Sequence, residues 1–83
     1  MNSYQVTIKV MPLKDLLDPQ GKAVLSGLHN LGLQSINDVR VGKNITVKIA
    51  ASDANQAKEI ATQAAKQLLA NLVMEEFEII VEA

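Results

Sequence analysis

The chain has 83 residues, 48% of them hydrophobic, with eight basic and nine acidic side chains and no cysteine. One small domain over residues 1–83 is therefore expected, and because a domain of this size is marginal alone and has no disulfide or thiolate metal site, we expect association with copies of itself or with partners. The net charge of −1, with one tyrosine and one phenylalanine, argues against a nucleic-acid partner. We find neither a signal peptide nor the ~20 apolar residues of a membrane helix, so we expect a cytoplasmic protein without a membrane partner.

The first predicted element is a strand from Tyr4 to Val10, in which apolar and polar residues alternate so that one face meets water. We expect Met11–Pro12 to end it, because proline has no N–H for the next bond of the sheet. The connector Leu13–Leu17 follows, and its leucines either cover a sheet edge or face a partner.

The stretch Leu17–Val24 predicts the start of a helix. Asp18 can accept a hydrogen bond from the first turn, and Pro19 suits the first helical position. Gly21 is a poor helix former that costs about 1 kcal/mol relative to alanine. Without a side chain there, the first-turn N–H groups are open to an anion, a partner's backbone or a neighbouring strand; the plain alternative is a capped helix packed tightly on its own sheet. The helix should run from Pro19 to Leu31, with an apolar stripe and a left-handed cap at Val24, Leu25, Leu28, Leu31 and Gly32.

A β-hairpin is predicted next. Val39–Val41 reads as a short strand, Gly42–Asn44 as a turn, and Ile45–Ile49 as an alternating strand. A loop this short permits only an antiparallel return, so the two strands should pair with each other.

The C-terminal half predicts a helix from Ala54 to Asn71, capped by Ser52 or Asp53, and a final strand from Glu76 to Glu82. The expected fold is thus a two-layer α+β domain of order β-α-β-β-α-β, ferredoxin-like, with an antiparallel sheet and two helices on one face. Ile80 lies on the other face among glutamates, and Ile36 is a second candidate for that face, which suggests a subunit contact. The apolar stripe of the second helix comprises Ala57, Ile60, Ala61, Ala64, Leu68 and Leu72.

Residues for catalysis or metal binding are not identified. His29 is the one base of the usual type, and a lone histidine beside Leu28 in a helix is more often a packing or surface residue. One histidine without cysteine argues against zinc, and the C-terminal glutamates read as a solvated strand face. Gly21–Lys22 lacks the remainder of a phosphate-binding loop. Arg40 and Lys43 flank the predicted turn, where they either reach an acidic partner or a phosphate, or are simply solvated.

Four pieces of the chain together resemble the PurS family, the small subunit of bacterial and archaeal phosphoribosylformylglycinamidine (FGAM) synthase. They occur in the family's order and at its spacing, and they span most of the chain. The pieces are Leu17–Val24 with Leu28 and Leu31–Gly32; Asp38–Lys43; the strand that begins at Ile45; and Leu68–Asn71.

This resemblance implies a non-catalytic subunit of FGAM synthase in de novo purine biosynthesis. The complex converts formylglycinamide ribonucleotide, ATP and glutamine to formylglycinamidine ribonucleotide. The small subunit would form a homodimer or homotetramer, bridge the glutaminase subunit PurQ and the synthetase subunit PurL, and assist ammonia transfer. ATP and magnesium would be used by the large subunit, with no cofactor bound by this chain. The alternative is a small-molecule-binding regulatory domain of ferredoxin-like type.

Two partner surfaces are predicted at the helix start and at the turn, with Asn71 added by resemblance, and the exposed sheet face is predicted to mediate self-association. The candidate partner-binding residues are Asp18, Gln20, Gly21, Lys22, Arg40, Gly42, Lys43 and Asn71.

Overall fold

The computed structural model describes residues 2–82 and contains one three-stranded antiparallel sheet of order β2-β1-β3. Two helices accompany the sheet, so the predicted α+β class with an antiparallel sheet is confirmed. The elements are β1 (Asn2–Pro12), α1 (Pro19–Asn30), β2 (Lys43–Ala51), α2 (Ala54–Ala64), the π-helical turn η1 (Ala65–Leu69) and β3 (Glu75–Glu82).

The core lies on one face of β1, the central strand. Val6, Ile8 and Val10 alternate along β1 and are fully buried. Ile8 pairs with Ile45 of β2 and with Ile79 of β3, so apolar side chains from all three strands share this face. Both β2 and β3 have one neighbour within the described chain and are therefore edge strands.

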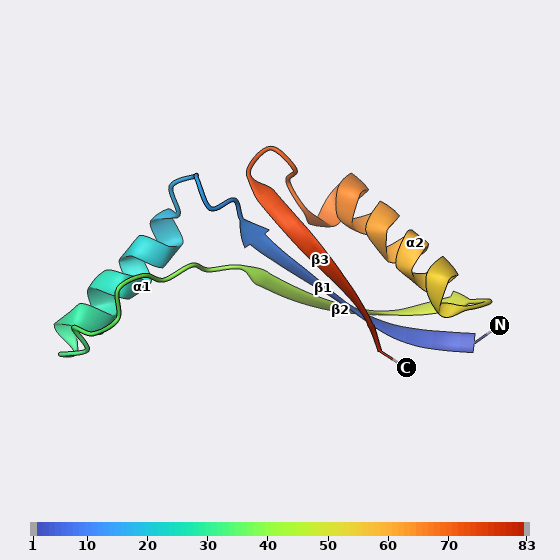
Figure 1. The fold of residues 1–83 in the computed structure, drawn as a ribbon, viewed down its shortest axis with the longest axis horizontal. Helices are drawn as coiled ribbons and strands as arrows, with labels where there is room; N and C mark the ends of the chain where they lie inside the picture. Colours follow the sequence, from blue (N-terminus) through green and yellow to red (C-terminus); the bar gives the residue numbers. More distant parts are fainter. Residues whose placement is uncertain (1, 83) are drawn as a thin grey trace.

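Helix α2 covers the apolar face of the sheet (Figure 1). Asp53 caps it, because its Oδ1 accepts a hydrogen bond from the Gln56 N–H at 2.7 Å. The residues in contact with the sheet are small: Ala57 and Ala61 are fully buried, as is Ala65 in η1. The stripe predicted from the sequence was too wide, since Ile60 and Leu68 are exposed.

Helix α1 does not lie on the sheet, which contradicts the prediction of two helices on one face. Figure 1 shows α1 beyond one end of the sheet, while α2 lies over it. The contacts between elements that involve a helix are made chiefly by α2. The molecule is consequently elongated, with extents of 51 × 25 × 14 Å.

The predicted hairpin is wrong. Within the described residues no strand occurs between α1 and β2, and residues 31–42 form an irregular segment. Its second residue, Gly32, has a φ of 91° and is the expected left-handed cap. Strand β2 starts at Lys43 and pairs with β1. Residues 39–41 instead run beside the start of α1, where the Val41 N–H bonds to the Asp18 side chain.

Strand β1 starts two residues earlier than expected, at Asn2, and ends at Pro12, as Met11–Pro12 predicted. Pro12 itself still pairs with Glu75 of β3. On the other side, pairing with β2 stops at Val10, opposite Lys43. Proline is tolerated because one side of the strand there has no neighbouring strand to receive a hydrogen bond.

Along residues 2–82, every helix falls short of the length and apolar character that a membrane span requires.

We predict that Ala61→Leu destabilises the fold by about 1–3 kcal/mol, because the added atoms overpack the contact between α2 and the sheet. Urea unfolding followed by circular dichroism measures the change. Gln63→Leu, at an exposed position of the same helix, is the control and should stay within about 0.5 kcal/mol of the wild type. Equal effects of the two substitutions would contradict the packing described for α2.

Candidate functional site

One carboxylate joins the start of α1 to the returning chain. Asp18 Oδ1 accepts a hydrogen bond from the Gly21 N–H at 3.0 Å, and Oδ2 accepts one from the Val41 N–H at 2.9 Å. The first bond is the predicted helix cap, with Pro19 following at the first helical position. The second bond occupies the backbone that we expected to pair in a hairpin. Asp18 therefore fixes the direction in which α1 leaves the sheet.

The charge of Asp18 is favoured by these contacts. The hydrogen bond from Val41 lowers the pKa of the carboxyl most, followed by the bond from Gly21, and the positive charge of Arg40 acts in the same direction. Because the pKa is lowered in the folded state, the contribution of this carboxylate to stability is complete above the unfolded pKa and is lost as the pH falls through the folded value.

Gly21 is required by the close approach of residues 39–41. A Cβ atom at this position would collide with the carbonyl oxygen of Val39 and would lie 2.6 Å from Asp18 Oδ2. Of the neighbours that the sequence left open for the first turn, the observed one is the chain's own returning segment. This segment is not a strand.

Gly42 has the same role at the end of β1. A Cβ atom there would collide with Met11 Sδ and with the Val10 carbonyl oxygen. The outgoing residues 13–18 and the returning residues 39–42 thus lie against each other, and we call these two segments the neck. Glycine at both positions lets the neck pack without side chains between its backbones.

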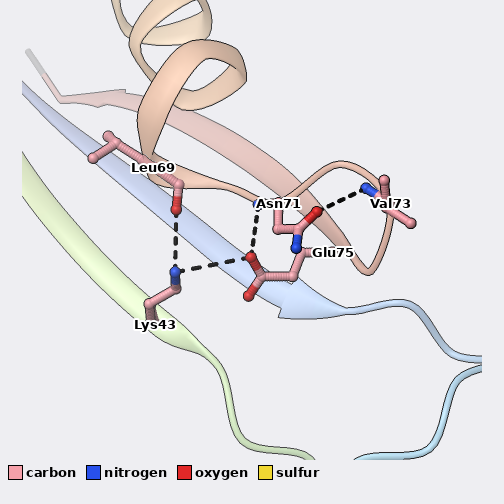
Figure 2. Close-up of polar contacts among 5 residues, drawn as sticks. All are labelled: Lys43, Leu69, Asn71, Val73 and Glu75. Atoms are coloured by element: carbon pink, nitrogen blue, oxygen red, sulfur yellow. Dashed lines mark hydrogen bonds and ion pairs between the residues drawn. The ribbon is translucent and has the colours of Figure 1, made fainter.

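Lys43 and Asn71 connect β2 to the end of η1 and the start of β3 (Figure 2). Lys43 Nζ donates to the Leu69 carbonyl oxygen at 3.1 Å and lies 3.8 Å from Glu75 Oε1. Glu75 Oε1 also accepts from the Asn71 N–H at 2.8 Å, while Asn71 Oδ1 accepts from the Val73 N–H. Asn71 therefore shapes the turn after η1, in agreement with its interpretation as a helix stop.

The neck brings most candidate residues to one end of the sheet, in three hollows. Asp18, Gln20 and Asn71 line one groove of about 350 Å³. Lys22 and Arg40 line a second hollow, which Asp18 also borders. The third hollow lies on the side of the sheet that faces away from α2, and its lining includes Gly42, Lys43, Met11 and Glu78.

The candidate residues predicted from the sequence did not include the apolar residues around the groove, although the leucines of the connector Leu13–Leu17 were expected either to cover a sheet edge or to face a partner. Leu16, Leu17 and Met74 line the groove and are exposed, Leu17 to 65%. Leu72 and Val73, in the turn before β3, are also exposed. An uninterrupted apolar triplet in a turn was the available signal, since turns are normally polar.

His29 has a structural contact. Its Nε2 donates to the Ile36 carbonyl oxygen at 2.8 Å and so holds the segment after α1. Ile36 consequently lies beside α1, which corrects its placement on the outer sheet face with Ile80. Among residues 2–82, no three His, Cys, Asp or Glu side chains converge as metal ligands would.

Chemically, the site offers apolar contact area ringed by charged groups and backbone donors. Such a surface suits the recognition of another protein chain. The fold and the site together define a small α+β interaction subunit.

The comparison with known proteins identifies the family. The family model described as "PurS: Phosphoribosylformylglycinamidine (FGAM) synthase" matches residues 5–83, and the chain belongs to the PurS family. The PurS subunit of Synechocystis is 40% identical over 76 residues, which cover 92% of this chain and 76% of that protein. The PurS subunit of Bacillus subtilis is 35% identical over 79 residues, covering 95% and 93%.

Solved structures agree with this assignment. B. subtilis PurS has a TM-score of 0.86 at 35% identity, covering 96% of this chain and 99% of its own. A chain in the structure of PurLQS from Thermotoga maritima has a TM-score of 0.90 at 28% identity, covering 99% and 100%. The chain is thus a subunit of FGAM synthase, the glutamine-hydrolysing ligase of purine biosynthesis, rather than an enzyme by itself. The resemblance inferred from the sequence is confirmed.

We predict that Gly21→Ala loosens the start of α1, because the new methyl group meets backbone atoms that cannot move independently. Overpacking of this kind costs about 1–3 kcal/mol and outweighs the better helix propensity of alanine. Hydrogen–deuterium exchange of the α1 amides should become faster.

Gly27→Ala is the matched control, since a Cβ atom there has nothing within 4 Å. This variant should slow exchange in α1, because alanine gains about 0.5–1 kcal/mol over glycine inside a helix. Slower exchange in both variants would contradict the close approach at Gly21.

We also predict a pH-dependent effect of Asp18→Ala. Above the ordinary pKa of 3.8, the variant should exchange its α1 amides faster than the wild type, because the ionised carboxylate accepts two backbone hydrogen bonds. The difference should shrink as the pH falls through the lowered pKa. Exchange measured over an acid series, corrected for intrinsic rates, tests this; a difference independent of pH would exclude the ionised carboxylate as its cause.

Proposed function

We propose that this chain, acting as one PurS-like domain over residues 1–83, bridges the glutaminase subunit PurQ and the synthetase subunit PurL in the cytoplasm and assists ammonia transfer between them. In this scheme the large subunit uses ATP and magnesium. The observation that carries the proposal is the projecting helix α1 with the neck, which places exposed apolar residues beyond the sheet. The match to a chain in PurLQS from T. maritima supports the same assembly.

A bridging role suits a chain of this chemistry. Ammonia released into water is largely protonated, so two coupled active sites have to be held in register along a sheltered route. Holding them requires contact surfaces rather than reactive groups, and correct positioning by itself contributes substantially to rate.

The candidate residues contribute to the proposed surfaces in two ways. Asp18, Gly21 and Gly42 set the shape of the neck through contacts within the chain. Gln20 and Lys22 are exposed at the start of α1, where they can meet a partner directly. Lys43 and Asn71, with Arg40, complete the set of partner-binding residues that we propose.

Self-association is assigned to α1 instead of the outer sheet face. Val24 on α1 and Leu31, the C-cap residue directly after it, are 44% and 76% exposed, whereas the outer face carries mainly polar residues around the half-buried Ile80. The neck keeps α1 away from its own sheet, whose apolar face is only partly covered, with Ile45 and Phe77 half-buried. The α1 helix of a second copy would therefore bury two complementary apolar surfaces at once.

Co-purification tests the bridging function. The tagged chain should retain PurQ and PurL of the same organism as one complex in size-exclusion chromatography, run with and without glutamine and ADP-magnesium. PurQ and PurL that assemble equally well without this chain, or that both fail to bind it in every condition, would refute the bridging role.

We predict that Leu31→Asp weakens self-association, because a charge replaces an apolar contact at the C-terminal end of α1. Burying a leucine side chain is worth about 1.5–3 kcal/mol, so dissociation should become at least about tenfold easier. Light scattering coupled to size-exclusion chromatography, over a dilution series, measures the oligomer. Leu68→Asp, a leucine 83% exposed on η1, is the control and should leave the oligomer unchanged. A stable wild-type monomer would remove this role of α1.

A further inference from the structure

Arg40 carries a donor that has no partner within the described chain. The residue is half-buried in the neck, and its Nη2 is shielded from solvent without a hydrogen bond. A guanidinium presents five N–H donors and has no acceptor. Because a buried donor without a partner is costly, such groups in native proteins call for an explanation, and a ligand absent from the isolated chain is one.

A hollow of about 340 Å³ surrounds this group. That volume lies at the small end of the range for ligand pockets. Arg40 is joined in the lining by two further cations, Lys14 and Lys22. The ion pair that the described residues do form, between Lys43 and Glu75, lies elsewhere.

Two of the three carboxylates of the hollow are engaged with backbone. Asp18 accepts from the N–H groups of Gly21 and Val41, and Asp38 Oδ1 accepts from the Val39 N–H at 3.0 Å. Arg40 forms no ion pair with a carboxylate of the described chain, in which Lys43 and Glu75 are the pair within 4.0 Å. The guanidinium is therefore free to bind an anion from outside.

The charge balance indicates which anion fits. Three cations are offset by three carboxylates, since Asp15 lines the hollow with Asp18 and Asp38. A dianionic phosphate would be repelled by these carboxylates, whereas a single carboxylate matches one planar guanidinium through paired N–H···O bonds. Leu16 and Leu17, both exposed, add apolar contact beside the cations, as a polypeptide ligand requires.

We propose that this hollow binds the carboxylate of an aspartate or glutamate side chain from another subunit of FGAM synthase, with Arg40 as its hydrogen-bonding partner. The proposal rests on the bridging function and adds the chemistry of one contact. The incoming carboxylate would pair with the N–H groups of Arg40 that line the hollow.

The test compares dissociation constants for PurL and PurQ, each measured by biolayer interferometry with the wild type, Arg40→Gln and Arg40→Lys. Arg40→Gln should weaken binding of one of the two subunits at least about tenfold, mainly through faster dissociation. Arg40→Lys should recover only part of the affinity, because an ammonium group lacks the planar fork. Lys58→Gln, the same change of charge on the exposed side of α2, should stay within about twofold, as distant rim charges do.

A salt series separates direct recognition from a structural role of Arg40. Wild-type affinity should fall more steeply with sodium chloride than that of Arg40→Gln, since only the wild type loses a charge pair. Thermal unfolding of each variant establishes that it is folded.

Equal affinities and equal salt dependence of the wild type and Arg40→Gln would overturn the proposal while leaving the bridging function intact. Arg40-dependent thermal stabilisation by inorganic phosphate, without any loss of subunit affinity, would overturn it too and assign the hollow to phosphate. Failure of the wild type to bind either subunit would instead refute the bridging function itself.

Discussion

The two hydrogen bonds accepted by Asp18 determine how this chain is arranged in space. One bond begins α1 and the other holds the returning backbone at Val41, so a single side chain joins the two segments of the neck to the start of α1. Gly21 and Gly42 make the closure possible by removing the side chains that would separate the backbones. The position of α1 beyond the sheet follows from this local geometry, and the sheet keeps only α2 as its cover.

Because only α2 covers the sheet, the isolated chain buries little apolar surface, and we expect assembly with other subunits to supply part of its stability. The largest fully buried side chains are Val6, Ile8 and Val10, and the helix over them contributes alanines. A core of this size is small for an isolated domain, whereas the apolar side chains left outside it are numerous. The exposed apolar side chains that leave the isolated chain only marginally stable are also the ones available for contact with another subunit. Binding of a partner to them would therefore stabilise the folded chain.

Local signals predicted the local structure well. The caps at Asp18 and Asp53, the proline at the first position of α1 and the left-handed Gly32 all depend on neighbouring residues, and each was predicted from them. Strands β2 and β3 followed from alternation. The hairpin prediction failed because alternation does not identify the partner of a segment: residues 39–41 pair with no strand, and the Val41 N–H bonds to the Asp18 side chain. The position of α1 and the unpartnered Arg40 depend on contacts between distant segments, which periodicity does not encode.

The two edge strands, β2 and β3, affect how unassembled copies of this chain can pair with one another. An open strand edge invites another edge to join it, and repeated joining leads to fibres. Here β3 carries glutamates at positions 76, 78 and 82, so two such edges aligned antiparallel would place like charges opposite one another. The charges on β3 therefore disfavour pairing of this edge with the same edge of another copy.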